Sequence, residues 1–114
     1  MSQKLSEINL KVYLDDENVP DTIEWQATDA PEPGMQEAKA MMISLWDADA
    51  RNALRIDLWT KDMSIDDMND FFFQVLLTMA DTYKRATNNK EIMADMKQFA
   101  REFAEKASEQ TSQS

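Results

Sequence analysis

The side chains that could perform chemistry in this 114-residue chain are carboxylates, because the sequence contains no histidine and no cysteine. Thiol nucleophiles, imidazole bases, disulfides and Cys/His zinc sites are therefore excluded. A carboxylate serves as a general acid or base when burial raises its pKa, and the candidates are Asp57 and Asp81. Neither has a second titrating partner, a phosphate-binding loop or a nucleophile elbow beside it. We expect no catalytic residues and no enzyme activity.

One short segment resembles the start of a calcium-binding loop. Asp47 and Asp49 stand at its first and third positions. The fifth position is Arg51, the sixth is Asn52 where glycine is needed, and the twelfth is Leu58 where a bidentate Glu belongs. We therefore expect no metal ion at this segment and no cofactor elsewhere in the chain.

The charge of the chain is strongly negative, with 12 Lys and Arg against 22 Asp and Glu and a formal net charge of −10. A nucleic-acid-binding surface needs clustered Lys and Arg, and an anionic membrane repels an acidic protein, so neither is expected as a partner. Ten of the acidic residues fall within residues 15–50, beside one basic residue, Lys39. This segment is either a set of solvated turns or a recognition surface for a basic partner.

The sequence has no recognisable targeting or membrane segment. Residues 1–13 alternate polar and apolar side chains, unlike a signal peptide with its continuous apolar core. The longest uncharged stretch, residues 71–80, is about half of the roughly 20 residues that a membrane helix needs. We expect a cytoplasmic protein that does not insert into a membrane.

Two β-hairpins are predicted from apolar residues that alternate over residues 8–14, 23–27, 41–46 and 54–59. A hairpin register is set by placing all apolar residues on one face. For the first hairpin this register pairs Leu14 with Ile23, Val12 with Trp25 and Leu10 with Ala27. For the second it pairs Met41 with Leu58, Ile43 with Ile56 and Leu45 with Leu54. Residues 28–37, with two prolines and the single glycine, are predicted to form the principal loop. The spacing over residues 37–46 also suits a helix, so that alternative stays open.

Two helices are predicted in the second half of the chain. Ser64 is a suitable N-cap, with Asp66 and Asp67 in the first turn. Apolar residues then recur at steps of three and four through about Ala86, and again over residues 92–107. The expected fold is a single α+β domain over residues 1–108, in which a four-stranded antiparallel sheet of two hairpins is followed by two helices packed on one face. Residues 109–114 are predicted to be a disordered tail.

The second hairpin is predicted to carry two tryptophans on its outer face. Met42, Trp46 and Trp59 have the parity opposite to the aliphatic set, and Asp47 and Asp49 lie in the adjoining turn. An apolar patch on a solvated sheet face is typical of a protein contact, so these five residues form the predicted interaction surface, and we expect a homo-oligomer. In the alternative interpretation the loop of residues 28–37, or the C-terminal tail, folds over the tryptophans.

Several stretches resemble the gliding motility protein GldC family of the Bacteroidetes. They are residues 39–47 (KAMMISLWD), 52–63 (NALRIDLWTKDM), 68–72 (MNDFF) and 79–87 (MADTYKRAT), and the run LRIDLWTK is the most specific. The resemblance covers nearly the whole chain. It implies an accessory role in the gliding machinery and the secretion system linked to it, with other proteins of that apparatus as partners and no catalytic residues.

Two further function classes are alternatives to an interaction protein. The order of four strands and two helices, with an acidic surface, is similar to the oligomeric export chaperone SecB, which holds unfolded clients, although this analogy concerns the fold alone. A chaperone of this kind should be a stable oligomer that suppresses aggregation of unrelated proteins. A small hydrolase is disfavoured because histidine, cysteine and glycine-rich loops are missing.

Overall fold

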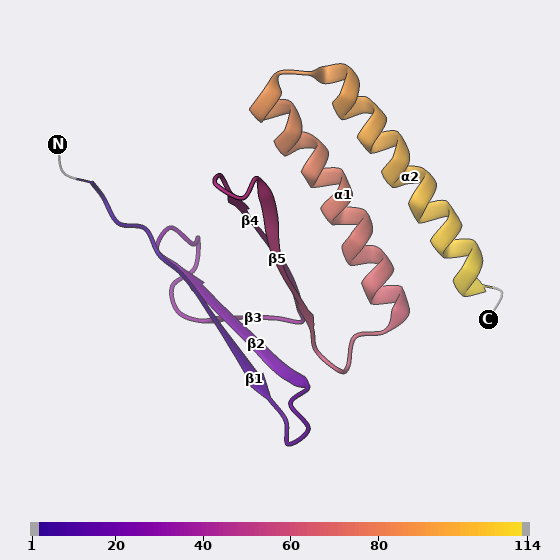
Figure 1. Cartoon of the computed structure of the whole chain (residues 1–114). Coiled ribbons are helices and arrows are strands. Elements are labelled where there is room, and N and C mark those ends of the chain that lie inside the picture. Colours follow the sequence, from indigo (N-terminus) through magenta and orange to yellow (C-terminus); the bar gives the residue numbers. More distant parts are fainter. Residues whose placement is uncertain (1–2, 113–114) are drawn as a thin grey trace. The chain divides into compact units, whose positions relative to one another are not determined.

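Five strands precede two helices in the computed structural model, which describes residues 3–112 (Figure 1). The strands are β1 (Ile8–Leu14), β2 (Pro20–Ala27), β3 (Gln36–Ala38), β4 (Ala40–Asp47) and β5 (Asn52–Trp59). The helices are α1 (Ile65–Thr87) and α2 (Lys90–Ser112). The strands belong to one compact unit, Met1–Met63, and the helices to a second, Ser64–Ser114. The predicted α+β class with two C-terminal helices is confirmed, and the packing of the helices on the sheet stays a prediction.

The predicted single four-stranded sheet is wrong. In the described residues the strands form a three-stranded antiparallel sheet in the order β1-β2-β3 and a two-stranded antiparallel sheet of β4 and β5. Lys39 is the one residue between β3 and β4. Residues 36–38 pair with β2, whereas the residues from Ala40 onward pair with β5. Because the two neighbours use successive parts of one extended run, the ladder divides at Lys39. The run is a strand, which decides against the helical alternative.

The register of the second hairpin is confirmed, since Met41 lies opposite Leu58, Ile43 opposite Ile56 and Leu45 opposite Leu54. The register of the first hairpin differs from the prediction by two residues. Its observed pairs are Ile8 with Ala27, Leu10 with Trp25 and Val12 with Ile23. A shift of two residues preserves which face each side chain occupies, so the predicted faces are right although the predicted pairs are wrong.

The turn between β1 and β2 explains that shift. The Asp15 carboxylate accepts hydrogen bonds from the backbone N–H groups of Glu17 (2.8 Å) and Val19 (3.0 Å), and the N–H of Asp15 donates to the carbonyl of Val19 (2.9 Å). Asn18 supplies the left-handed residue with φ of 64°. These bonds close the chain so that Leu14 already lies opposite Pro20. Side-chain bonding to the local backbone, typical of Asp in turns, therefore fixes the Leu14–Pro20 pair, and an irregularity between Tyr13 and Leu14 shifts the register of the other pairs by one residue.

The end of β5 is held to the remainder of the first unit by residues 60–62. Thr60 is fully buried, its N–H donates to the carbonyl of Lys39 (2.8 Å), and its hydroxyl donates to Asp62 (2.5 Å). The Lys61 ammonium pairs with Asp15 at 3.1 Å, and its backbone N–H donates to the carbonyl of Pro20 (3.2 Å). The segment Thr60–Asp62 thus joins the two-stranded sheet to the β1–β2 turn and to the first residue of β2.

The caps of α1 match the local sequence. The Ser64 hydroxyl accepts from the N–H of Asp67 (3.0 Å), and the Asp67 carboxylate accepts from the N–H of Ser64 (3.3 Å), which is a reciprocal capping box. At the other end Asn88 has φ of 59°, and its N–H donates to the carbonyl of Lys84 (2.7 Å). The predicted N-cap is confirmed, and the left-handed Asn88 ends α1 before α2 begins.

The two helices pack against each other through small side chains. Ala80 of α1 and Ala100 of α2 are both fully buried. The rings of Phe72 and Phe103 lie 6.4 Å apart between centroids, and Lys97 forms an ion pair with Asp81 at 2.8 Å. Helix α2 continues to Ser112, past the end expected near Ser108. Residues 113–114 of the predicted tail lie outside the described residues.

Candidate interaction surface

The predicted interaction residues lie on one face of the β4–β5 hairpin and in its turn. Successive side chains of a strand point to opposite faces, and directly opposite residues of paired strands share a face. We use the name tryptophan face for the side that holds Ala40, Met42, Ser44 and Trp46 on β4 and, opposite them, Trp59, Asp57, Arg55 and Ala53 on β5. The other side of this hairpin is aliphatic.

The two tryptophans are exposed and stand at opposite ends of the tryptophan face. Trp46 retains 62% of its surface and Trp59 retains 52%. Trp59 lies opposite Ala40, six positions before Trp46, which corresponds to about 20 Å along the strand at roughly 3.3 Å per residue. Met42, partly exposed, lies nearer the Trp59 end. The structure thus keeps the predicted residues on one face but separates the tryptophans from each other.

A polar cluster occupies the centre of the tryptophan face. The Arg55 guanidinium donates through Nε and Nη2 to the two carboxylate oxygens of Asp57, at 3.1 and 2.9 Å, and through Nη1 to the Ser44 hydroxyl at 2.6 Å. The hydrogen bonds that Arg55 donates to Asp57, and the negative charge of Asp57, raise the pKa of Arg55. Asp57 is consequently an ion-pair partner, and sequence reasoning missed Arg55 and Ser44 as members of this surface. The signal was present, because the predicted register already places both on this side.

The turn between β4 and β5 uses one of the two predicted acidic residues for its own structure. The Asp47 carboxylate accepts from the N–H groups of Asp49 (3.0 Å) and Ala50 (3.2 Å), while Asp49 is exposed. Arg51 has φ of 53°, and its guanidinium carbon lies 5.7 Å from the centre of the Trp46 ring, within the range of a cation–π contact. Trp46 therefore has a cation on one side and remains open elsewhere.

The structure gives Asp81 no catalytic environment. The hydrogen bond with Lys97 lowers the pKa of Asp81; desolvation opposes this shift, and the charges of Lys97, Arg85 and Lys84 add to it. A general acid near neutral pH needs a shift in the opposite direction. Among residues 3–112 there is no group of three or more acidic side chains arranged to hold a metal ion.

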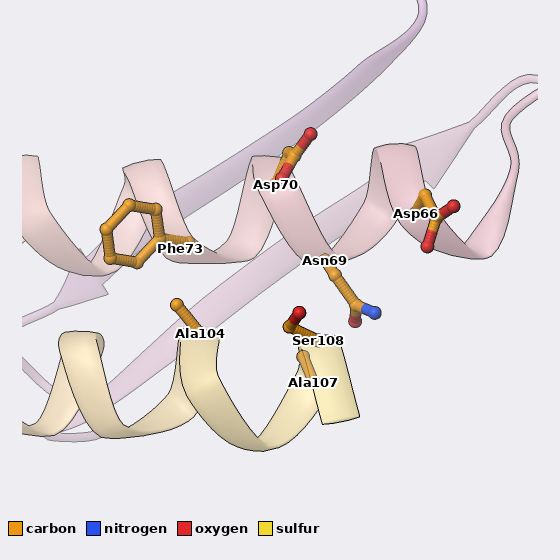
Figure 2. Close-up of a pocket in the computed structure, with 7 residues that line it drawn as sticks. All are labelled: Asp66, Asn69, Asp70, Phe73, Ala104, Ala107 and Ser108. Carbon is orange, nitrogen blue, oxygen red and sulfur yellow. The ribbon is translucent and has the colours of Figure 1, made fainter. Parts of the chain in front are cut away.

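The helical unit has an open pocket of about 330 Å³ between α1 and α2 (Figure 2). Its lining residues are Asp66, Asn69, Asp70, Phe73, Ala104, Ala107 and Ser108. In Figure 2 the side chain of Asn69 points from α1 toward α2, whereas Asp70 points away. The lining has two carboxylates, Asp66 and Asp70, and no basic side chain.

Neither described helix has a stretch that is both long enough and apolar enough to cross a membrane.

Comparison with known proteins identifies a family for this chain. No curated protein and no solved structure matches the chain, so the likeness to SecB in the order of elements has no support from a known structure. A family model described as gliding motility-associated protein GldC-like matches residues 20–109, which is more than half of the chain and includes the whole tryptophan face. The chain therefore belongs to the GldC-like family of gliding motility-associated proteins.

Proposed function

We propose that this chain is a non-enzymatic accessory protein of the gliding machinery, and that it binds another protein of that apparatus in the cytoplasm through the tryptophan face. The observation that carries the proposal is the exposure of Trp46 and Trp59 on one side of a regular hairpin. Tryptophan is enriched among the residues that dominate the energy of protein interfaces. Family membership supplies the process in which the contact takes place.

The layout of the tryptophan face indicates the kind of partner it fits. Two aromatic anchors separated by about 20 Å leave room for roughly six extended residues between them. The centre, with Arg55 and Asp57, offers hydrogen bonds to polar groups of the partner. At the Trp46 end the exposed Asp49 adds negative charge, in keeping with the acidic segment 15–50. The partner expected here has two apolar anchor points with polar groups between them.

The proposal is tested by complementation in a gliding bacterium that lacks its own family member. The double variant Trp46→Ala/Trp59→Ala removes both anchors, and Tyr13→Ala is the control because Tyr13 is an aromatic residue on β1 with a similar exposure of 48%. We expect the double variant to abolish colony spreading while Tyr13→Ala preserves it. Normal spreading by a double variant that is folded and expressed at the native level would overturn the proposal.

A further inference from the structure

The outer edge of β5 has no partner strand in the described part of the chain, where β5 pairs with β4 alone. A two-stranded sheet has marginal stability in water, and a free edge is a template for another strand. Proteins often protect such edges with Pro, charged side chains or a bulge. The segment Asn52–Trp59 has no Pro and no bulge, and its two charged residues, Arg55 and Asp57, have opposite signs.

The backbone groups that face outward from β5 follow from one hydrogen bond. The N–H of Thr60 donates to the carbonyl of Lys39, on the side of β4. In an antiparallel strand the N–H and C=O of one residue point to the same side, and this side alternates along the strand. The even-numbered residues of β5 therefore face β4. The odd-numbered residues present free backbone donors and acceptors at the edge, and these are Ala53, Arg55, Asp57 and Trp59.

The side chains of β5 are complementary to a reversed copy of themselves. Around Ile56 the sequence reads Leu-Arg-Ile-Asp-Leu. When two copies run antiparallel with Ile56 opposite Ile56, Arg55 lies opposite Asp57 of the second copy, and Leu54 lies opposite Leu58. Opposite charges and aliphatic pairs across strands are both stabilising. A register centred on Arg55 or on Asp57 would instead place like charges opposite each other.

We propose that two copies of this chain join edge to edge through β5, antiparallel about Ile56, to form a four-stranded sheet. In this register the outward-facing residues pair with outward-facing residues, so Arg55 and Asp57 of the two copies exchange backbone hydrogen bonds. The two tryptophan faces then lie on the same side of the joined sheet, and each Asp57 carboxylate lies between two guanidinium groups. The inference does not depend on the proposed function, because it rests on the backbone edge of β5 and on the pairing of Arg55 with Asp57, and not on the two tryptophans.

A single introduced cysteine tests the register, since the chain has none of its own. In the proposed pairing Ile56 faces its own copy in a non-hydrogen-bonded pair with Cα atoms about 4.5 Å apart, which a disulfide can span. Ile56→Cys should form a covalent dimer on mild oxidation. Leu54→Cys is the matched control, because Leu54 is an exposed aliphatic residue on the same face and its two copies would lie about 14 Å apart along the strand. Equal cross-linking of both variants, or of neither, would overturn the proposed pairing.

Charge reversal tests the pairing without a cross-link. The native chain should sediment at twice its mass of 13.2 kDa. Arg55→Asp and Asp57→Arg each place like charges opposite each other and should raise the dissociation constant at least about tenfold. An equimolar mixture of the two variants restores opposite charges in every pair and should form a heterodimer. Far-UV circular dichroism confirms that each variant is folded. A monomeric native chain, unchanged dissociation of folded single variants, or failure of the mixture to associate would contradict the inference.

Discussion

Replacing Phe72 by alanine should destabilise the helical unit by about 2 to 3 kcal/mol. Emptying a fully buried Phe site costs about 3 to 5 kcal/mol, and that is the cost expected if Phe72 is a core residue. In the structure Phe72 keeps 40% of its surface exposed, so the loss scales to roughly three fifths of that range. The truncation removes the packing of this ring against Phe103, whose ring centroid lies 6.4 Å away.

Urea unfolding followed by circular dichroism at a helical wavelength measures this effect. The double-mutant cycle of Phe72→Ala and Phe103→Ala should give a coupling energy of about 0.5 to 1.5 kcal/mol, because the two rings touch. Ile65→Ala is the control, since Ile65 is on the same stripe of α1 with 74% exposure and its truncation should cost less than about 0.5 kcal/mol. A Phe72→Ala midpoint equal to the native one, or a coupling energy of zero, would refute the packing described for α1 and α2.

Two further predictions concern the turn at Asp15 and the cap at Ser64. The N–H groups of Val19 and Glu17, and then Lys61, lower the pKa of Asp15 below its ordinary value of 3.8, so the folded state binds this proton less readily than the unfolded chain. The resulting stabilisation is present above pH 3.8 and is lost as the pH falls below it, and Asp15→Asn should flatten that acid limb in urea titrations at successive pH values. If the stability of Asp15→Asn fell at acid pH as steeply as that of the native chain, this role of Asp15 would be contradicted. Ser64→Ala removes the capping box of α1 and should cost about 1 kcal/mol in thermal unfolding, whereas Ser64→Asp should keep most of the stability. An equal loss of thermal stability in Ser64→Ala and Ser64→Asp would show that the capping box does not stabilise α1.

The parts of the fold that follow from side-chain alternation could be predicted from the sequence. The apolar residues of β4 and β5 fit one face in one register, and that register is the observed one. For β1 and β2 alternation specifies the face but accepts any shift by two residues. The deciding contacts are those of the Asp15 carboxylate with the backbone of Glu17 and Val19, and they depend on the conformation of the turn.

The alternation of polar and apolar residues does not predict the division into two sheets. Residues 36–47 continue one extended pattern, with no Pro or Gly to mark a break. The break at Lys39 arises because β2 pairs with the part of this run before Lys39 and β5 pairs with the part after it. The position of the break therefore depends on how far β2 and β5 each extend along the run. The expectation of one sheet assumed full overlap of all four strands.

For the candidate surface, the sequence predicts on which side of the hairpin each residue lies, but not which side chains bond to each other. Trp46 and Trp59 are on the expected side and are exposed. The register also places Arg55, Asp57 and Ser44 between them, but a pattern of apolar residues gives no weight to polar neighbours. Their bonding depends on the reach of the guanidinium across to β4 and along β5. The predicted apolar patch therefore has a polar centre between its two tryptophans.

The most direct test of the proposed role of the tryptophan face is the dissociation constant of the complex with the partner that copurifies with the native chain. Calorimetry with the purified partner should give at least about a hundredfold weaker binding for Trp46→Ala/Trp59→Ala, since a truncated interface tryptophan commonly costs about 2 kcal/mol or more. Tyr13→Ala should bind as the native chain does. Equal affinities for the native chain and the double tryptophan variant would contradict the proposal that this face binds the machinery.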